Sequence, residues 1–211
     1  MTGKNHMLFG SVASLYFLPK LGYEPDIMTT TAAIISSLIP DLDHPRAKIN
    51  QKILPIKNRL GKIFFYCGIG SFLLYQYGIE NRLTLAIAIL LIMIGFSRHR
   101  SFTHSLIGSF AISSVVFFVL RNTLPYPVLL SFIVGLCSHL IGDYMTITGI
   151  GLFYPFTDKR YRFVLIISSS NMAEPFIGLF FIYLIIHYYI NNDFSMNFFY
   201  SLFYSLFYMF K

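Results

Sequence analysis

Long uncharged apolar runs, separated by short polar gaps, constrain this 211-residue chain more than any other feature. The clearest runs are residues 64–78, 83–97, 105–120, 126–142 and 172–190. Charged residues make up only 12% of the chain, about half of their share in an ordinary soluble domain. No amphipathic surface helix could place so many Phe, Ile and Leu side chains on all of its faces. The sequence therefore predicts an all-α fold, a polytopic membrane helical bundle.

Three further runs are weaker. Residues 7–18 and 27–39 are shorter than the ~20 residues that a helix needs to cross the hydrocarbon core, and residues 194–210 are strongly aromatic. With them the count is about six to eight membrane segments. We expect residues 1–192 to form one membrane-embedded domain and residues 193–211 to form an aromatic C-terminal membrane segment.

The basic residues predict an orientation. Following the alternation of the runs, all of the 16 Lys and Arg residues except Lys20, Arg82 and Arg121 fall on one side. Lys and Arg favour cytoplasmic loops, so we expect both termini on the cytoplasmic side of a bacterial plasma membrane. The net charge of +7 then indicates loops that face anionic lipid, and no nucleic-acid partner is expected.

The first 22 residues and the two cysteines suggest no processing or cross-link. The N-terminal stretch lacks a strong basic region and an A-x-A-like cleavage site, so we expect it to be retained. Cys67 and Cys137 both lie within apolar runs, where we expect small packing residues and no disulfide.

The segment HLIGD places His139 and Asp143 four residues apart near the end of an apolar run. On a helix the two side chains share one face. They could bind one metal ion, or the carboxylate could orient the imidazole. The alternative is a capped helix end with a packed polar residue. Ionisable residues at the border of a membrane segment are costly, and this favours a functional role.

The segment PDLDHP supplies Asp41, Asp43 and His44 where another run ends. Carboxylate and imidazole donors at this density suit a divalent ion. The alternative is a helix terminus followed by an ordinary turn, because Pro and Asp are common turn formers.

The segment SRHRSFTHS contributes His99 and His104, with Arg98 and Arg100 beside the first histidine. His104 is the stronger candidate ligand because it opens the next predicted helix. The two guanidinium groups could clamp a phosphate, although a positively charged cytoplasmic loop explains the arginines equally well.

Four other residues are weaker candidates. His6 begins the first run and could be merely interfacial. Glu174 lies in the first turn of its predicted helix, where the helix dipole alone favours a carboxylate. Lys159 and Arg160 belong to a basic loop that could hold an anionic head group or simply be solvated.

Taken together, the candidates offer about three histidines and three or four carboxylates on one side of the membrane. This set suffices for one or two divalent ions, with Zn²⁺ expected and Mn²⁺ or Mg²⁺ as alternatives. No cysteine neighbours the clusters, which excludes a four-thiolate zinc site. No G-x-S-x-G nucleophile elbow is present.

The order of an early His6, then PDLDHP, RHRSFTHS and SHLIGDYMTITGIGLFYPF resembles the YdjM-like family over roughly residues 3–175. These are LexA-regulated inner-membrane proteins of bacteria, described as metal-dependent hydrolases. The metal ligands that the resemblance implies are His6, Asp41, Asp43, His104, His139 and Asp143. A more distant likeness to zinc-dependent phospholipase C and P1-type nucleases would add Glu174. The family loop HRGxTHS is HRSFTHS here, a mild departure that changes no ligand.

The leading hypothesis is a membrane-embedded metal-dependent hydrolase of a phosphoester or lipid head group at the cytoplasmic leaflet. Its partner would be a membrane lipid or lipid-linked phosphate, and His104 or Asp43 would act as general base. The residues expected to hold the substrate's negative charge are Arg98, Arg100, Lys159 and Arg160. The alternatives are a transporter or lipid carrier, and a non-enzymatic regulator with a structural metal site.

Overall fold

The chain is all-helical within the residues that the computed structural model describes, which are 1–211 except 45–46, 54–57, 164–172 and 192–211. The described α-helices are α1 (Gly3–Lys20), α2 (Ile27–Ser36), α3 (Lys48–Ile53), α4 (Arg59–Tyr77), α5 (Arg82–Phe96), α6 (Leu106–Leu120), α7 (Tyr126–Tyr144) and α8 (Ala173–Asn191). Two short 3-10 helices, η1 (Pro40–Asp43) and η2 (Phe102–His104), lie between them. An isolated bridge joins Ile150 to Tyr161, and no strand is assigned in the described part.

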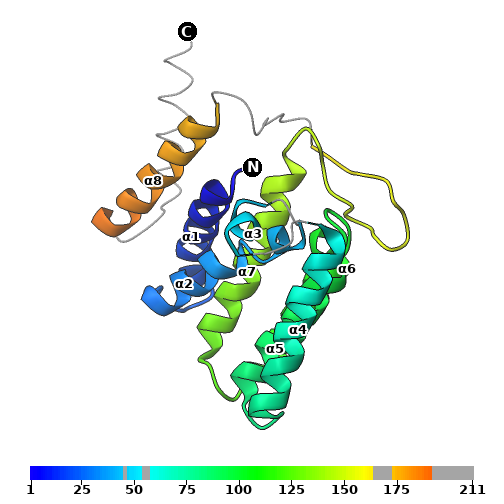
Figure 1. Ribbon diagram of the computed structural model, residues 1–211. Coiled ribbons are helices and arrows are strands. Elements are labelled where there is room, and N and C mark those ends of the chain that lie inside the picture. Colours follow the sequence, from blue (N-terminus) through cyan, green and yellow to red (C-terminus); the bar gives the residue numbers. More distant parts are fainter. Residues whose placement is uncertain (45–46, 54–57, 164–172, 192–211) are drawn as a thin grey trace.

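The helices form two groups that share α7 (Figure 1). Helices α1 and α2 pack against each other and against α7, while α4 and α5 form an antiparallel pair with α6 beside α5. Helix α6 contacts α7, which joins the groups, and α8 lies against α1 on the outside. An apolar core of Ile39, Tyr66, Ile94, Ile112 and Leu136 fills the space where α4, α5, α6 and α7 meet.

The predicted runs correspond closely to the observed helices. The five clear runs lie within or overlap α4 to α8, and the two weak N-terminal runs become α1 and α2. Helix α1 begins at Gly3, earlier than the run at 7–18, because the polar residues before Met7 also adopt helical geometry. The run at 194–210, and with it the predicted segment 193–211, lies outside the described residues.

Two described helices, Tyr126–Tyr144 and Glu174–Asn191, are long and apolar enough to cross a membrane. Helices α5 and α6 are apolar but have only 15 residues each. The all-α class is therefore confirmed for the described chain. The count of six to eight membrane segments and the cytoplasmic termini stay predictions.

Apolar side chains also cover the outside of the bundle. Phe64, Tyr75, Phe110, Phe156 and Ile190 are each at least 75% exposed. A soluble monomer rarely leaves apolar surface of this extent in water. The outer surface therefore suits contact with lipid.

Side-chain caps fix where several helices begin. Asp26 forms a capping box with Thr29 at the start of α2, and Asn58 and Asn81 accept hydrogen bonds from the first turns of α4 and α5. Ser105 does the same for α6, directly after His104. Such caps satisfy N–H groups that have no partner inside the helix. The boundaries bring η1, η2 and the C-terminus of α7 to the upper end of the bundle in Figure 1, which we call the site end.

Small residues allow α2 and α7 to approach each other closely. A Cβ atom added to Gly135 of α7 would lie 2.1 Å from Ser36 Oγ and 2.3 Å from the carbonyl oxygen of Ala33. Between α1 and α7, the Ser14 and Ser131 hydroxyls form a buried 2.9 Å hydrogen bond. Small residues and interhelical hydrogen bonds are the usual means of packing helices in membranes.

This packing predicts that Gly135→Ala destabilises the protein. The new methyl group has no room and must push α2 from α7, at a cost of about 1–3 kcal/mol. Thermal unfolding in detergent measures the change. The matched control is Gly68→Ala on α4, where an added Cβ meets nothing within 4 Å. Helix propensity should leave that variant neutral or more stable by up to ~1 kcal/mol. Equal unfolding temperatures for the two variants would contradict the described packing.

Candidate metal centre

Four side chains distant in the sequence converge at the site end. Asp41 on η1, His104 on η2, and His139 and Asp143 on α7 each offer a ligand atom, and these atoms all lie within 4.8 Å of one another. His104, His139 and Asp143 are buried, whereas the Asp41 side chain is 26% exposed. A cluster of two imidazoles and two carboxylates suits a divalent cation.

A backbone carbonyl sets the tautomer of His139. Its Nδ1 lies 2.6 Å from the carbonyl oxygen of Ser37, which can only accept, so Nδ1 donates. In the neutral ring Nε2 then carries the lone pair, and it faces the cluster. Such a hydrogen bond from the far ring nitrogen is the usual support of a metal-binding histidine.

His104 has the same arrangement with a carboxylate. Its Nδ1 lies 3.3 Å from Asp43 Oδ2, and its Nε2 lies 3.2 Å from His139 Nε2 and 3.5 Å from Asp143 Oδ2. Two Nε2 lone pairs cannot face each other at this distance unless a proton or another cation lies between them. The donor set therefore fits a divalent metal ion.

Asp43 is the most heavily hydrogen-bonded carboxylate at the site end. Besides His104, it accepts hydrogen bonds from His99 Nδ1 (2.8 Å), the Arg100 backbone N–H (3.1 Å) and the Thr103 hydroxyl (2.5 Å). Burial alone would raise the pKa of Asp43, but His104 and His99 outweigh it and hold that pKa well below its usual range. Asp43 thus ties η1 to the loop that carries His104.

The ligand atoms of Asp43, His99 and His104 also form a group within 4.8 Å. His104 belongs to both groups, so the site end has room for one or two ions among the described residues. The sequence favoured His104 over His99 as a ligand, and the prediction that Asp43 is a ligand stays a prediction. Its contacts suit an outer carboxylate that orients His104 equally well.

His6 supports the cluster from α1. Its ring stacks on that of His139 with centroids 3.9 Å apart, and its Nε2 lies 3.1 Å from Asp143 Oδ1. The same oxygen is 3.2 Å from the Met1 amine. His6 Nδ1 is buried and has no hydrogen-bond partner among the described atoms. His6 lies outside both candidate groups, so its assignment as a ligand stays a prediction.

Glu174 is engaged elsewhere. Its carboxylate accepts hydrogen bonds from the Thr2 backbone N–H (3.1 Å), the Thr2 hydroxyl (2.9 Å) and the Asn5 amide (2.6 Å). It therefore joins the start of α8 to the first residues of α1. Within the described chain Glu174 belongs to neither candidate metal group.

Of the four predicted substrate-binding cations, Arg100 lies nearest the cluster. Its guanidinium is 3.9 Å from Asp143 Oδ2 and donates to the Gly149 carbonyl at 3.2 Å. The Arg100 backbone has φ of 59°, which is uncommon and strained for a residue other than glycine. The side chains of Arg98, Lys159 and Arg160 are exposed, and Lys159 lies 5.7 Å from the centre of the Tyr161 ring.

The partly exposed groups mark the open side of the cluster. Asp41, His99 and Arg100 have side chains that are 26%, 32% and 17% exposed. The remaining members are almost completely buried. Among the described residues, the exposed side of the cluster is therefore that of η1 and the His99–Arg100 loop.

Helix α4 fixes the two loops that carry the cluster. The ammonium of buried Lys62 donates to the carbonyls of Ile94 (2.9 Å) and Ser97 (2.5 Å), at the end of α5. One turn later, the Tyr66 hydroxyl donates to Asn50, whose amide donates to the carbonyls of Leu42 and His44. By sequence position, Lys62 is one of the basic residues expected on the cytoplasmic side. A lysine within a helical run, as in GKIFFY, was the signal that pointed to this anchor.

Comparison with known proteins identifies the family of this chain. The family model described as "YdjM inner membrane protein" matches residues 1–211. The chain belongs to the YdjM family. It is 25% identical over 195 residues to the "Uncharacterized protein YvsG" of Bacillus subtilis (strain 168), covering 89% of this chain and 98% of that protein. It is 25% identical over 188 residues to the "Inner membrane protein YdjM" of Escherichia coli (strain K12), covering 84% of this chain and 77% of that protein.

Membership of the YdjM family places the chain in the bacterial inner membrane. The resemblance drawn from the sequence motifs is therefore confirmed. The more distant likeness to phospholipase C and P1-type nucleases has no support in these comparisons. No solved structure matches the chain.

We expect Asp143→Asn to abolish stable metal binding. Asp143 contributes to the four-residue group, and outer-partner changes alone weaken metal affinity about 10–100-fold, so losing a ligand should cost at least about 100-fold. Metal content after purification, together with Zn²⁺ titration, measures the loss. The control is Asp158→Asn in an exposed loop, which should bind metal as the wild type does. Unchanged metal content in Asp143→Asn would contradict this site.

Metal binding should also release a proton. Burial would lower the pKa of His104, but the Asp43 and Asp143 carboxylates outweigh it and raise that pKa to about 10. His104 therefore carries a proton at neutral pH, which an ion must displace from Nε2. Below pH 10 the apparent affinity should rise about tenfold per pH unit for one released proton. Calorimetry in buffers of different ionisation enthalpy counts the protons, and a count of zero would exclude His104 as a ligand.

Proposed function

We propose that this protein is a membrane-embedded metal-dependent hydrolase that cleaves a phosphoester, such as a lipid head group, at the cytoplasmic leaflet. The convergence of Asp41, His104, His139 and Asp143, of which Asp41 is partly exposed, is the observation that carries the proposal. A divalent ion bound there would polarise a phosphoryl oxygen and lower the pKa of a bound water to about 7.

In this proposal the buried residues bind the metal ion, and the partly exposed residues act on the water and the substrate. His104, His139 and Asp143 form the inner wall, with Asp43 and the Ser37 carbonyl fixing the two imidazoles. Asp41 is the only partly exposed member of the four-residue group, and its carboxylate can take a proton from water on the open side. The sequence motifs predict His104 or Asp43 in this role, but Asp43 already accepts hydrogen bonds from its neighbours.

Arg100 is the group best placed to bind the phosphate. Its guanidinium lies beside Asp143 on the open side, and a guanidinium binds phosphate through paired hydrogen bonds. Lys159 and Arg160 lie farther out and add positive charge without a described contact to the cluster. The strained Arg100 backbone is consistent with a side chain held in place for binding.

The membrane setting supports a lipid substrate. Apart from Lys20, Arg82 and Arg121, the basic residues that the structure describes belong to segments at the site end, as expected for a cytoplasmic face. Anionic lipid head groups would lie at this depth. A soluble phosphoester could reach the same open side, so the assay must include both kinds of substrate.

The burial of three of the four ligand residues also favours a second candidate, a structural metal site in a non-enzymatic regulator. Structural sites are typically closed by protein ligands, whereas catalytic sites keep a position for water. The partly exposed Asp41 argues for the catalytic case.

The test is a hydrolysis assay on metal-loaded protein with phospholipids and soluble phosphomonoesters. We expect Arg100→Gln to raise KM about 10–100-fold, the effect of losing a charge-assisted hydrogen bond, without loss of bound metal. The control Arg121→Gln changes an exposed cation at the end of α6 that lies away from His104, and it should alter KM little. Bound metal without turnover, together with unfolding on chelation, would reject the hydrolase in favour of the structural site.

A further inference from the structure

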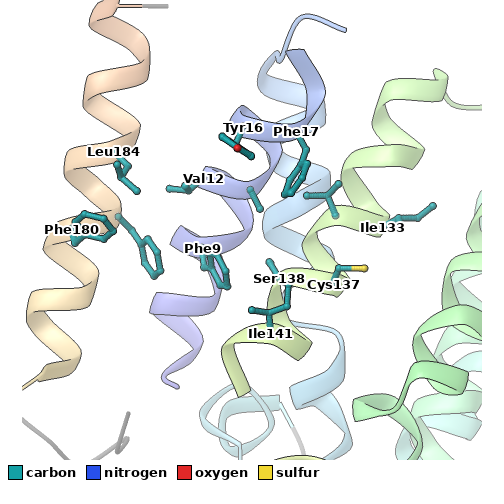
Figure 2. A pocket seen from close by; sticks show the side chains of 13 residues that line it. Phe9, Val12, Tyr16, Phe17, Ile133, Cys137, Ser138, Ile141, Phe180 and Leu184 are labelled. Atoms are coloured by element: carbon teal, nitrogen blue, oxygen red, sulfur yellow. The ribbon is translucent and has the colours of Figure 1, made fainter. Parts of the chain in front are cut away.

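A long apolar groove runs along α1 (Figure 2). It encloses about 600 Å³ between α1, α7 and α8. Figure 2 shows Phe9, Val12 and Phe17 of α1 between Ile133 and Ile141 of α7 and the side chains of α8. Tyr16 and Ser138 are the only polar residues in the lining. The groove is therefore suited to a hydrocarbon.

The groove has the length of one lipid leaflet. On α1 its lining runs from Phe9 to Phe17, which is about 12 Å at 1.5 Å per residue, and on α7 it runs the same length from Ile133 to Ile141. Half of a hydrocarbon core of ~30 Å is about 15 Å. An apolar groove of this length that runs along the helices matches an extended acyl chain.

A cation lies at one end of the groove. Phe9, Ala13, Tyr16 and Lys20 follow one another on α1 at helical spacing, so Lys20 is one turn beyond the lining. Its exposed ammonium lies 3.7 Å from the centre of the Tyr16 ring. Among the described residues no carboxylate forms a salt bridge with it. An anionic head group would complement this charge.

We propose that the groove binds one acyl chain of an anionic phospholipid, with the lipid phosphate paired to Lys20. Lys20 is at the opposite end of α1 from His6, so this lipid belongs to the leaflet opposite the site end. The proposal does not depend on hydrolase activity. The bound chain would fill the space between α8 and the rest of the bundle, where Leu184 and Val12 form only a small apolar cluster.

Native mass spectrometry of the full chain tests the proposal. Delipidated protein is mixed with micelles that contain phosphatidylglycerol or phosphatidylcholine with the same acyl chains. The wild type should retain one phosphatidylglycerol in preference to phosphatidylcholine. Lys20→Gln should reduce that preference about fivefold, the effect of one cation at a membrane surface. Val134→Phe, which fills the groove, should remove the retained lipid of either kind.

Matched controls separate this site from general lipid contact. Arg121→Gln removes another cation that lies over an aromatic ring, at 5.8 Å from the Phe118 centroid, and should keep the preference. Val115→Phe adds the same bulk to a half-buried position of α6 and should keep the lipid. The Lys20 variant requires no repacking, so it still tests the proposal if Val134→Phe does not fold.

Three results would overturn the proposal. These are equal retention of both lipids by the wild type, equal effects of Lys20→Gln and Arg121→Gln, and unchanged retention in Val134→Phe. A change of oligomeric state in Val134→Phe without a loss of lipid would instead indicate that a second copy of the chain covers the groove.

Discussion

The close approach of His104 Nε2 and His139 Nε2, 3.2 Å apart between buried carboxylates, is the constraint on which the rest of the structure depends. Burying imidazoles and carboxylates away from water is costly unless each has a partner. The Ser37 carbonyl, Asp43 and His6 supply such partners from three other segments. A proton on His104, or a cation bound between the two imidazoles, completes the pairing of these groups.

Buried polar contacts around the cluster fix loops that are far apart in the sequence. Lys62 binds the end of α5, where the carbonyls carry the negative end of the helix dipole, and Tyr66 acts through Asn50 on the segment after η1. Glu174 joins the start of α8 to the start of α1. These anchors explain how loop residues can form a rigid site, because each loop is fixed by buried side chains of a neighbouring helix.

Much of this could be predicted from the sequence. Apolar runs located the helices, and the positions of Asp41, His104 and Asp143 at the ends of runs predicted that they share one membrane depth. The sequence could not distinguish ligands from their supports. Asp43 and Asp41 are two residues apart in one motif, yet one accepts hydrogen bonds from the His99–His104 loop and the other reaches solvent. The role of Glu174 could not be predicted from the sequence either, because only tertiary packing brings Thr2 and Asn5 to its carboxylate.

The brevity of α5 and α6 has a consequence for the surrounding bilayer. Fifteen residues extend about 22 Å, several ångströms less than a hydrocarbon core of ~30 Å. On the prediction that both helices cross the bilayer, the lipid would have to thin locally or the connecting loop would have to lie closer to the hydrocarbon. That loop carries His99, Arg100 and His104, so membrane thickness would then set the depth of the cluster relative to the water boundary.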